Sequence, residues 1–204
     1  MRIITGKFKG RALKMPKGIR PTQDKVRKAI FDILMDVEGL TFLELFAGSG
    51  AVGLEAVSRG AKGLVLVESD RNCQLVIKEN MEHLKTDNVI VYPQEVSRAL
   101  EHLNKVQKKF DIIFLDPPYH KEKIPSPGDS SSEENASTLS KKTLQLLGCC
   151  DILAPNGFVI VEHFKRDPLP EDIAGFALIK RASYGDTFLS FYVVGKELKS
   201  SPAI

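Results

Sequence analysis

The stretch TFLELFAGSGAVGLEAVSRGAKGLVLVE, residues 41–68, decides which fold this sequence predicts. It contains two short apolar runs, 41–46 and 63–68, separated by a glycine-containing turn and a helical pattern over 49–60. Apolar runs of this length that alternate with helices are typical of parallel strands covered on both faces. The stretch therefore predicts a β–α–β unit with a tight turn after its first strand.

The same alternation continues further along the chain. Strands are expected over 88–92, 110–115 and 157–164, and helices over 71–84, 95–107 and 143–153. This order of elements predicts a doubly wound α/β sheet.

The two ends of the chain add to this sheet. The stretch RPTQDKVRKAIFDIL, residues 20–34, predicts a helix that begins after the proline, with Thr22 as its N-cap. Two strands are expected within 176–196, with Gly185 and Asp186 near the turn between them. A closing hairpin of this kind implies an antiparallel addition to a parallel sheet.

Length and composition narrow the class of protein. With 204 residues we expect a single domain, 1–204, in which the serine-rich interval 121–142 forms a mobile loop. No apolar run approaches the roughly 18 residues of a membrane span, and the first residues lack a secretory signal. Three cysteines without metal-ligand spacing favour a reducing cytosol and no metal site. We therefore expect a cytoplasmic protein, and a monomer.

The charge is concentrated at one end. Residues 1–28 hold ten Lys and Arg against Asp24 alone, a balance of +9, whereas the remaining 19 bases and 25 acids give −6. Such a segment suits a polyanion such as RNA, because lysine and arginine release the counterions of its phosphates. A solubilising arm without a ligand is the alternative. The candidate RNA contacts are Lys7, Lys9, Arg11, Arg20 and Arg27.

The turn after the first strand is a candidate cofactor site. Gly48, Gly50 and Gly53 match G-x-G-x-x-G, and Glu68 ends the next strand 20 residues after Gly48, where a carboxylate can accept two ribose hydroxyls. These features fit either NAD or S-adenosylmethionine. Glu44 favours S-adenosylmethionine, because a carboxylate at the tip of the first strand can attract the cationic amino group of a methionine moiety. NAD has no such cation.

The tetrapeptide DPPY, residues 116–119, is the candidate catalytic tip. An exocyclic amine of a nucleobase is a poor nucleophile, because its lone pair is delocalised into the ring. The Asp116 carboxylate and the Pro117 carbonyl can accept both N–H bonds and orient that lone pair, while Tyr119 can stack on the base. A turn that merely ends the strand is the alternative interpretation.

Five stretches taken together resemble the RsmD family, bacterial methyltransferases that act on guanine N2 in small-subunit ribosomal RNA. They are ITGKFKGRAL (4–13), RPTQDKVRKAIFDIL (20–34), LELFAGSGAVGLEAVSRGA (43–61), FLDPPY (114–119) and VEH (161–163). The resemblance covers nearly the whole chain. It implies a seven-stranded Rossmann-like sheet with an antiparallel last strand, a short basic N-terminal extension, S-adenosylmethionine as cofactor and ribosomal RNA, within a small-subunit particle, as partner.

The resemblance also implies roles for individual residues. Glu68 would bind the ribose, Asp116 with Pro117 would present the amine, and Thr22 would line the methionine side. Glu95 stands where the family usually has Asp or Asn contacting the adenine amine, which is a departure from its pattern. The residues implied to wrap the methionine end are Phe46, Ala47, Gly48, Ser49 and Gly50.

Three other functions remain open at this point. An adenine-N6 methyltransferase would use the same tip, and an NAD-dependent oxidoreductase would explain the glycines and Glu68 but not DPPY. A catalytically silent RNA-binding domain would explain the basic segment alone. The four histidines show no ligand spacing, and we interpret them as surface or strand-end residues: His83, His102, His120 and His163.

Overall fold

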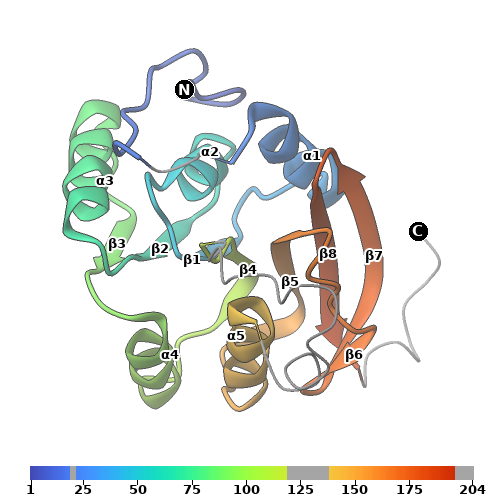
Figure 1. The fold of residues 1–204 in the computed structure, drawn as a ribbon. Coiled ribbons are helices and arrows are strands. Elements are labelled where there is room, and N and C mark those ends of the chain that lie inside the picture. Colours follow the sequence, from blue (N-terminus) through green and yellow to red (C-terminus); the bar gives the residue numbers. More distant parts are fainter. Residues whose placement is uncertain (19–21, 119–137, 196–204) are drawn as a thin grey trace.

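The computed structural model describes residues 1–18, 22–118 and 138–195. One sheet runs through this part of the chain, with the strand order β3-β2-β1-β4-β5-β8-β7-β6 (Figure 1). The five strands from β3 to β5 are mutually parallel, and β8 is antiparallel to both of its neighbours. The strands are β1 (Thr41–Leu45), β2 (Gly63–Val67), β3 (Val89–Tyr92), β4 (Phe110–Leu115), β5 (Leu153–Phe164), β6 (Asp172–Ile173), β7 (Phe176–Tyr184) and β8 (Thr187–Val194).

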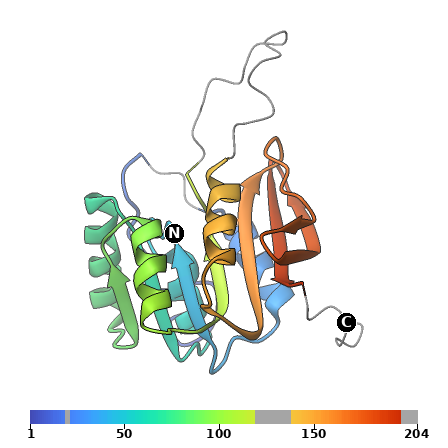
Figure 2. The same cartoon turned by 90° about the horizontal axis from the view of Figure 1, so that it is seen from below.

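Five helices cover the two faces of the sheet (Figure 2). Strand residues alternate between these faces, so that Phe42 and Phe114 belong to one buried cluster while Leu43 and Leu115 belong to the other. The first cluster includes side chains of α1 (Asp24–Leu34), α2 (Ala51–Ser58) and α3 (Arg71–Leu84), and the second those of α4 (Val96–Lys105) and α5 (Leu139–Gly148). The predicted doubly wound sheet with an antiparallel C-terminal strand is confirmed.

The expected strand count of seven is wrong, because β6 adds an eighth strand at the edge. Asp172 and Ile173 pair with Ala177 and Phe176 of β7. Positive φ angles at Ala174 and Gly175, 52° and 86°, turn the chain tightly between the two strands. A strand of two residues has no apolar run long enough to be visible in the sequence.

Several element boundaries also differ from expectation. The helix expected over 143–153 ends at Gly148, and the strand expected over 157–164 begins at Leu153. Helix α5 begins at Leu139, where the Thr138 hydroxyl accepts a 3.4 Å bond from the backbone N–H of Lys141, so the predicted loop 121–142 ends too late. Its residues 121–137 lie outside the described part of the chain. Helix α1 begins at Asp24, not directly after the proline, and its N-cap is Gln23. The side chain of Thr22, expected at that cap, is used elsewhere.

The basic N-terminal segment is fixed to α2. The buried Glu55 carboxylate accepts the backbone N–H groups of Ile4 and Thr5 at 2.7 and 2.9 Å. Gly6 lies so close to α2 that a Cβ atom there would come within 1.8 Å of the Ser58 carbonyl oxygen. Apolar side chains of the segment enter the core, namely Ile3, Phe8 and Leu13. The segment therefore holds its cations on a rigid base instead of extending into solvent as an arm.

No helix within the described ranges is long and apolar enough to cross a membrane.

Candidate active site

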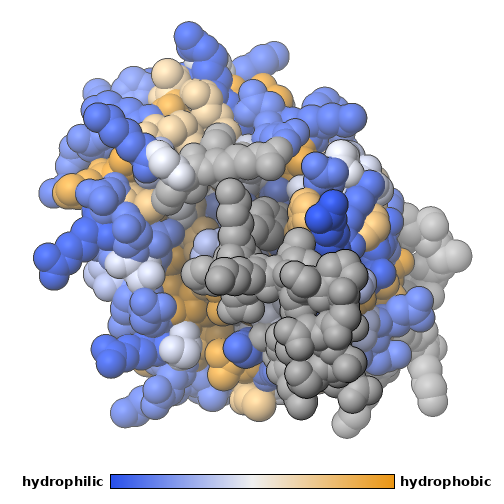
Figure 3. Space-filling model, in the orientation of Figure 1, coloured by the Kyte–Doolittle hydropathy of each residue, from blue (hydrophilic) through white to orange (hydrophobic). Residues whose placement is uncertain are grey.

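The carboxyl ends of the parallel strands meet at one edge of the sheet, and the sequence-predicted site residues come from that edge. The chain leaves β1 toward β2 and β3 on one side and later returns to add β4 and β5 on the other. Ligands of open α/β sheets bind at such a reversal of strand order. This edge faces the viewer in Figure 3, where hydrophilic residues form most of its outer margin.

The glycine turn after β1 is compact on one side and open on the other. Phe46, Gly48 and Gly50 all have positive φ, at 58°, 56° and 71°. A Cβ atom on Gly50 would lie 3.0 Å from the Leu66 side chain, whereas one on Gly48 would meet nothing within 4 Å. The backbone at Gly48 therefore borders free space that a ligand can occupy. Ala47 and Ser49, between these residues, are buried.

Gly53 has a different function from the other two glycines. A Cβ atom there would lie 2.5 Å from Leu64 and 2.7 Å from the Glu44 carboxylate. Its absence lets α2 approach the sheet closely, and the third glycine of the motif thus serves helix–strand contact rather than the ligand.

Glu68 joins the tip of β2 to the glycine turn. Its half-buried carboxylate accepts the N–H of Gly48 at 2.7 Å through Oε2 and the N–H of Asp70 at 2.8 Å through Oε1. Asp70 in turn caps α3 by accepting the N–H groups of Asn72 and Cys73. The carboxylate predicted to bind a ribose is therefore held directly beside the open side of the turn.

Glu44 is a buried carboxyl group in β1. Its side chain is 3% exposed, and its Oε2 accepts the N–H of Gly53 at 2.8 Å. Burial raises the pKa of Glu44 to about 8, against the opposing effect of the backbone donors of Gly53 and Val52. A cationic ligand beside it would favour its charged form.

Asp116 directly follows β4 and contacts the segment before α1. The Thr22 hydroxyl donates a 3.2 Å hydrogen bond to its Oδ2. Burial raises the pKa of Asp116 to about 7, while the bond from Thr22 lowers it. Pro117, directly after it, is buried. Tyr119, the third predicted catalytic residue, lies outside the described residues.

Glu95 lies at the same edge but farther along it. It precedes α4, beyond the end of β3, and its side chain is exposed and makes no capping bond. The edge therefore brings together Thr22, Glu44, residues 46–50, Glu68 and Asp116, with Glu95 at its margin.

Within the described residues, the predicted RNA contacts divide into three groups. Lys7 and Lys9 are exposed, and neither has an ion-pair partner among the described residues. Arg11 is also exposed, but it donates to the carbonyl oxygens of His83 and Leu84 at the end of α3. Arg20 lies outside the described part of the chain.

Arg27 is the third group, and its predicted contact with RNA is wrong. Its side chain is 0% exposed and donates to the carbonyl oxygen of Arg2 and, at 3.1 Å, to Asp24. Burial lowers the pKa of Arg27. The physical reason is its place on the inner face of α1, three and four residues before the buried Ile30 and Phe31.

Asn80 is a site residue that sequence reasoning missed. It is 1% exposed, and its Nδ2 donates to the carbonyl oxygens of Ser49 and Lys14, each at 3.1 Å. Its Oδ1 accepts the N–H of Lys14 at 2.8 Å. One amide thus ties the basic segment to the glycine turn. The sequence did contain a signal for this role. Asn80 is a polar residue on the apolar stripe of α3, which includes Cys73 and Ile77.

The histidines do not form a further site. His83 and His102 are exposed as expected, and His120 lies outside the described residues. His163 lies near the end of β5, in agreement with the strand-end interpretation, and it is fully buried. Its Nε2 lies 2.8 Å from the Ser190 hydroxyl and its Nδ1 2.8 Å from the Asp167 carbonyl oxygen. Within the described ranges, no group of three or more His, Cys, Asp and Glu could hold a metal ion.

The residues at this edge fit a nucleoside that carries a cation. Open space at Gly48 admits a ligand against the backbone, Glu68 offers a ribose acceptor, and the buried Glu44 offers an anionic partner to an ammonium group. Asp116 lies at the neighbouring strand end, where a second substrate could meet the first.

Comparisons with known proteins agree with this arrangement. Residues 1–193 match the family model described as Conserved hypothetical protein 95. The chain is 35% identical to YlbH of Bacillus subtilis over 196 residues, 94% of this chain and 98% of that protein. It is 33% identical to Ribosomal RNA small subunit methyltransferase D of Escherichia coli (strain K12) over 195 residues, 94% of this chain and 89% of that protein.

A solved structure shares the fold over the same length. The Escherichia coli methyltransferase homologue yhhF superposes with a TM-score of 0.77 at 32% identity, covering 94% of this chain and 96% of that one. The family model spans the glycine turn and the end of β4. The methyltransferase relatives decide between the two cofactors that the glycines alone left open. The chain belongs to the Conserved hypothetical protein 95 family, the RsmD/YlbH family of class I methyltransferases that use S-adenosylmethionine.

Proposed function

We propose that this protein transfers a methyl group from S-adenosylmethionine to the exocyclic N2 of a guanine in small-subunit ribosomal RNA. The observation that carries the proposal is the pairing of Asp116 with Thr22 at the sheet edge, one strand away from the glycine turn. A carboxyl group with a pKa of about 7 is held there beside a buried proline. The choice of RNA is supported by the relatives of Escherichia coli and Haemophilus influenzae, both named Ribosomal RNA small subunit methyltransferase D and both 33% identical to this chain.

In this proposal, Asp116 and Pro117 prepare the amine for attack. The Asp116 carboxylate accepts one N–H bond and the Pro117 carbonyl accepts the other, so the nitrogen lone pair is turned out of conjugation with the ring. S-adenosylmethionine supplies a methyl group on a sulfonium that leaves as a neutral thioether. The nitrogen–carbon bond forms as the sulfur–carbon bond breaks, and the nitrogen then loses a proton. With its pKa near neutrality, Asp116 is suited to accept that proton.

The remaining edge residues hold the methyl donor. Glu68 accepts the ribose hydroxyls while keeping the turn in place through Gly48, and Glu44 attracts the methionine ammonium. Glu95, whose exposed side chain precedes α4, would contact the adenine. Thr22 acts on the substrate side, by fixing and stabilising the Asp116 carboxylate.

An adenine-N6 methyltransferase is the second candidate. Asp116 and Pro117 would orient that amine equally well, and the geometry of the tip does not favour either base. The names of the relatives favour guanine. Lys7 and Lys9, held on the rigid N-terminal segment, would contact phosphates in either case.

Nucleotide-resolved mapping of methylguanine in small-subunit RNA, from cells with and without this protein, tests the base and the position together. We expect one guanine to lose its N2-methyl group without the protein and to regain it when purified protein and S-adenosylmethionine are added to the undermethylated particles. A modification that disappears from an adenine instead would replace the first candidate with the second. An unchanged methylation map would contradict both.

In single-turnover assays on these particles, Asp116→Ala should slow methyl transfer by about 10²-fold or more, because one of the two orienting acceptors is lost. Its affinity for S-adenosylhomocysteine should change by less than about 1 kcal/mol, because no contact of the glycine turn or of Glu68 depends on that carboxylate. Asp36→Ala, an exposed aspartate after α1, is the matched control and should leave both quantities unchanged. Transfer by Asp116→Ala at the parent rate would show that the amine clamp is wrong.

A further inference from the structure

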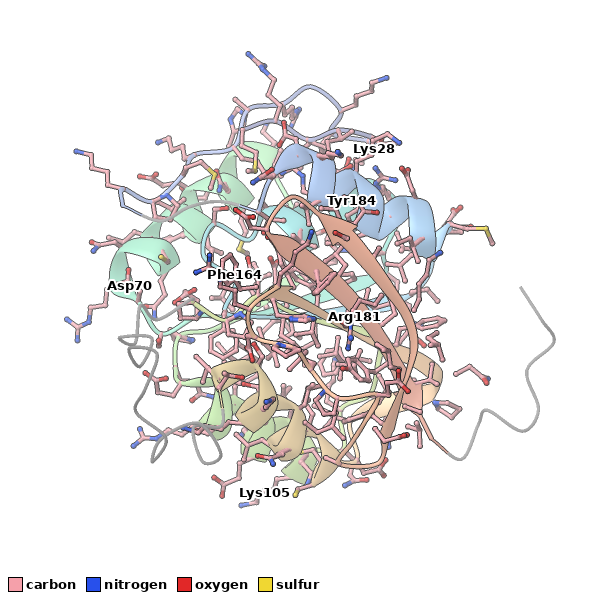
Figure 4. All side chains as sticks on the ribbon, turned by 45° about the vertical axis from the view of Figure 1, so that its right-hand side comes forward. Lys28, Asp70, Lys105, Phe164, Arg181 and Tyr184 are labelled. Atoms are coloured by element: carbon pink, nitrogen blue, oxygen red, sulfur yellow. The ribbon has the colours of Figure 1, made fainter. Side chains whose placement is uncertain are left out.

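A groove of about 400 Å³ lies between α1 and β7, on the face of the sheet opposite α4 and α5. One wall comes from Lys25, Lys28 and Asp32 of α1, and the other from Lys180 and Tyr184 of β7. We call it the lysine groove. Figure 4 shows Lys28 and Tyr184 on these two facing elements, with Lys105 of α4 on the far side of the molecule.

The charge of the lysine groove favours an anionic ligand. It contains three lysines and one aspartate, a balance of +2. Asp32 pairs with Lys28 at 2.6 Å, while Lys25 and Lys180 are exposed and have no ion-pair partner among the described residues. Two cations from elements about 150 residues apart in the chain thus face one channel. Two such cations on opposite walls of one groove suit a chain of phosphates better than a single small anion.

Both walls of the lysine groove start at the catalytic edge. Helix α1 begins two residues after Thr22, which donates to Asp116, and Lys25 lies in its first turn. On the other wall, Tyr184 is the last residue of β7 and pairs with Thr187, which pairs with Phe164 at the carboxyl end of β5. Figure 2 shows the turn between β7 and β8 at the same edge as the end of β4. A nucleic-acid strand whose target base is held at Asp116 can therefore continue into the lysine groove.

Tyr184 adds a surface for a base. Its side chain is half-buried and packs against the apolar cluster beneath α1. This packing holds the ring at the end of the groove next to the turn between β7 and β8. Aromatic rings beside a cationic channel are the usual means of binding unpaired nucleotides without sequence preference, because every base can stack.

We propose that the lysine groove binds the sugar–phosphate backbone of the unpaired RNA next to the target nucleotide, with Lys25 and Lys180 on phosphates and Tyr184 against a base. The proposal rests on the proposed function, because it assumes that the molecule held at Asp116 is RNA. It assigns the groove to RNA and not to an acidic segment of a ribosomal protein.

The test compares two double variants that remove equal charge. Lys25→Gln/Lys180→Gln empties the groove of its unpaired cations, and Lys105→Gln/Lys108→Gln removes two exposed lysines at and just after the end of α4. Binding of deproteinised small-subunit RNA that lacks the modification is measured over a range of salt concentrations. Each lost phosphate contact to a single strand should lower the slope of log K against log salt by about 0.7, so the groove variant should lose about 1.4.

The control variant should keep the parent slope, and both variants should keep the parent affinity for S-adenosylhomocysteine. Tyr184→Phe should bind RNA like the parent and Tyr184→Leu more weakly, since the ring and not the hydroxyl stacks. Equal slopes for the groove variant and the parent would overturn the proposal, as would a loss of binding seen only with assembled particles, which would indicate a protein partner. If the parent methylates RNA and the groove variant has the parent's salt slope, only the assignment of the groove is wrong. If the parent neither binds nor methylates RNA, the proposed function fails with it.

Discussion

The hydroxyl group of Thr22 and the carboxylate of Asp116 are joined by a 3.2 Å hydrogen bond between residues 94 positions apart in the chain. It links the segment before α1 to the residue that follows β4. The bond favours the charged form of Asp116, whereas burial favours the neutral form. A residue outside the motif of the proposed amine acceptor therefore shifts its protonation equilibrium.

Replacing Thr22 should shift the pH dependence of methyl transfer. In the parent protein, the single-turnover rate should rise with pH through about 7, because the deprotonated Asp116 is the stronger acceptor of an N–H bond and the form that can take up the proton. Thr22→Val removes the bond that lowers the pKa of Asp116, so the rising limb should move to higher pH while the rate at high pH changes little. Thr22→Ser retains a hydroxyl and should keep the parent profile. Identical profiles for Val and Ser would show that the bond does not control the carboxylate.

Removing the Glu68 carboxylate should weaken cofactor binding. Glu68→Ala leaves the N–H of Gly48 and the ribose hydroxyls without their acceptor, at a cost of about 1 to 3 kcal/mol in the binding free energy of S-adenosylhomocysteine. Isothermal titration calorimetry measures this directly. Glu101→Ala, an exposed glutamate on α4, should bind like the parent. Preference of the parent protein for NAD over S-adenosylhomocysteine would contradict the cofactor assignment.

Glu44 should make the folded state less stable as the pH rises. Its folded pKa of about 8 lies above the value of 4.5 expected for an unfolded chain, so between these pH values the unfolded state loses a proton that the folded state keeps. The free energy of unfolding then falls by at most about 1.4 kcal/mol per pH unit from this group. Asp116 contributes in the same direction up to about pH 7.

Glu44→Gln should remove the Glu44 part of this decline. The amide keeps an oxygen for the N–H of Gly53 but carries no proton to lose. Urea unfolding at pH 5 and pH 8 should therefore show a smaller difference for the variant than for the parent. An equal difference in both proteins would mean that Glu44 is already ionised in the folded state at pH 5.

Lysine and arginine substitutions in the N-terminal segment should have different effects. Lys7→Gln/Lys9→Gln should lower the salt slope of RNA binding by about 1.4 and leave the free energy of unfolding unchanged, because both side chains are exposed without ion-pair partners among the described residues. Arg11→Gln should lower the free energy of unfolding, by about 1 kcal/mol, because it removes donors from the last carbonyls of α3. Salt titrations and urea unfolding on the same samples separate the two effects. A lower free energy of unfolding for the lysine variant would show that Lys7 and Lys9 have a structural role.

The central sheet and the glycine turn could be predicted from sequence because their signals are local. The apolar runs around residues 41–68 mark buried parallel strands, and each lies within one residue of the observed strand. The two residues of β6 leave no such run, which is why the eighth strand was missed. The start of α5 at Leu139 was missed because only Leu139 interrupts a polar run before residue 144.

The site residues could be predicted from sequence where a single local motif indicates both the residue and its role. Thr22 is a residue type that is favoured at N-caps, and nothing near it in the sequence reveals its partner Asp116, 94 residues away. Arg27 was assigned to RNA from the charge of its segment, although its spacing from Ile30 and Phe31 on α1 places it on the inner face. Charge density describes a segment, whereas burial depends on the helical position of each residue.

The attachment of the N-terminal segment to α2 limits how this protein can be dissected. Truncation of the first ten residues would take away both backbone donors of Glu55 and the main-chain partners of the Ser58 hydroxyl, while Glu55 would keep its 2.9 Å ion pair with Arg59. It would also expose the apolar surface that Ile3 and Phe8 cover. A shortened chain would therefore lose stability together with its positive charges, and a change in its RNA binding could not be assigned to charge alone. Substitution of side chains in the intact polypeptide separates the two effects.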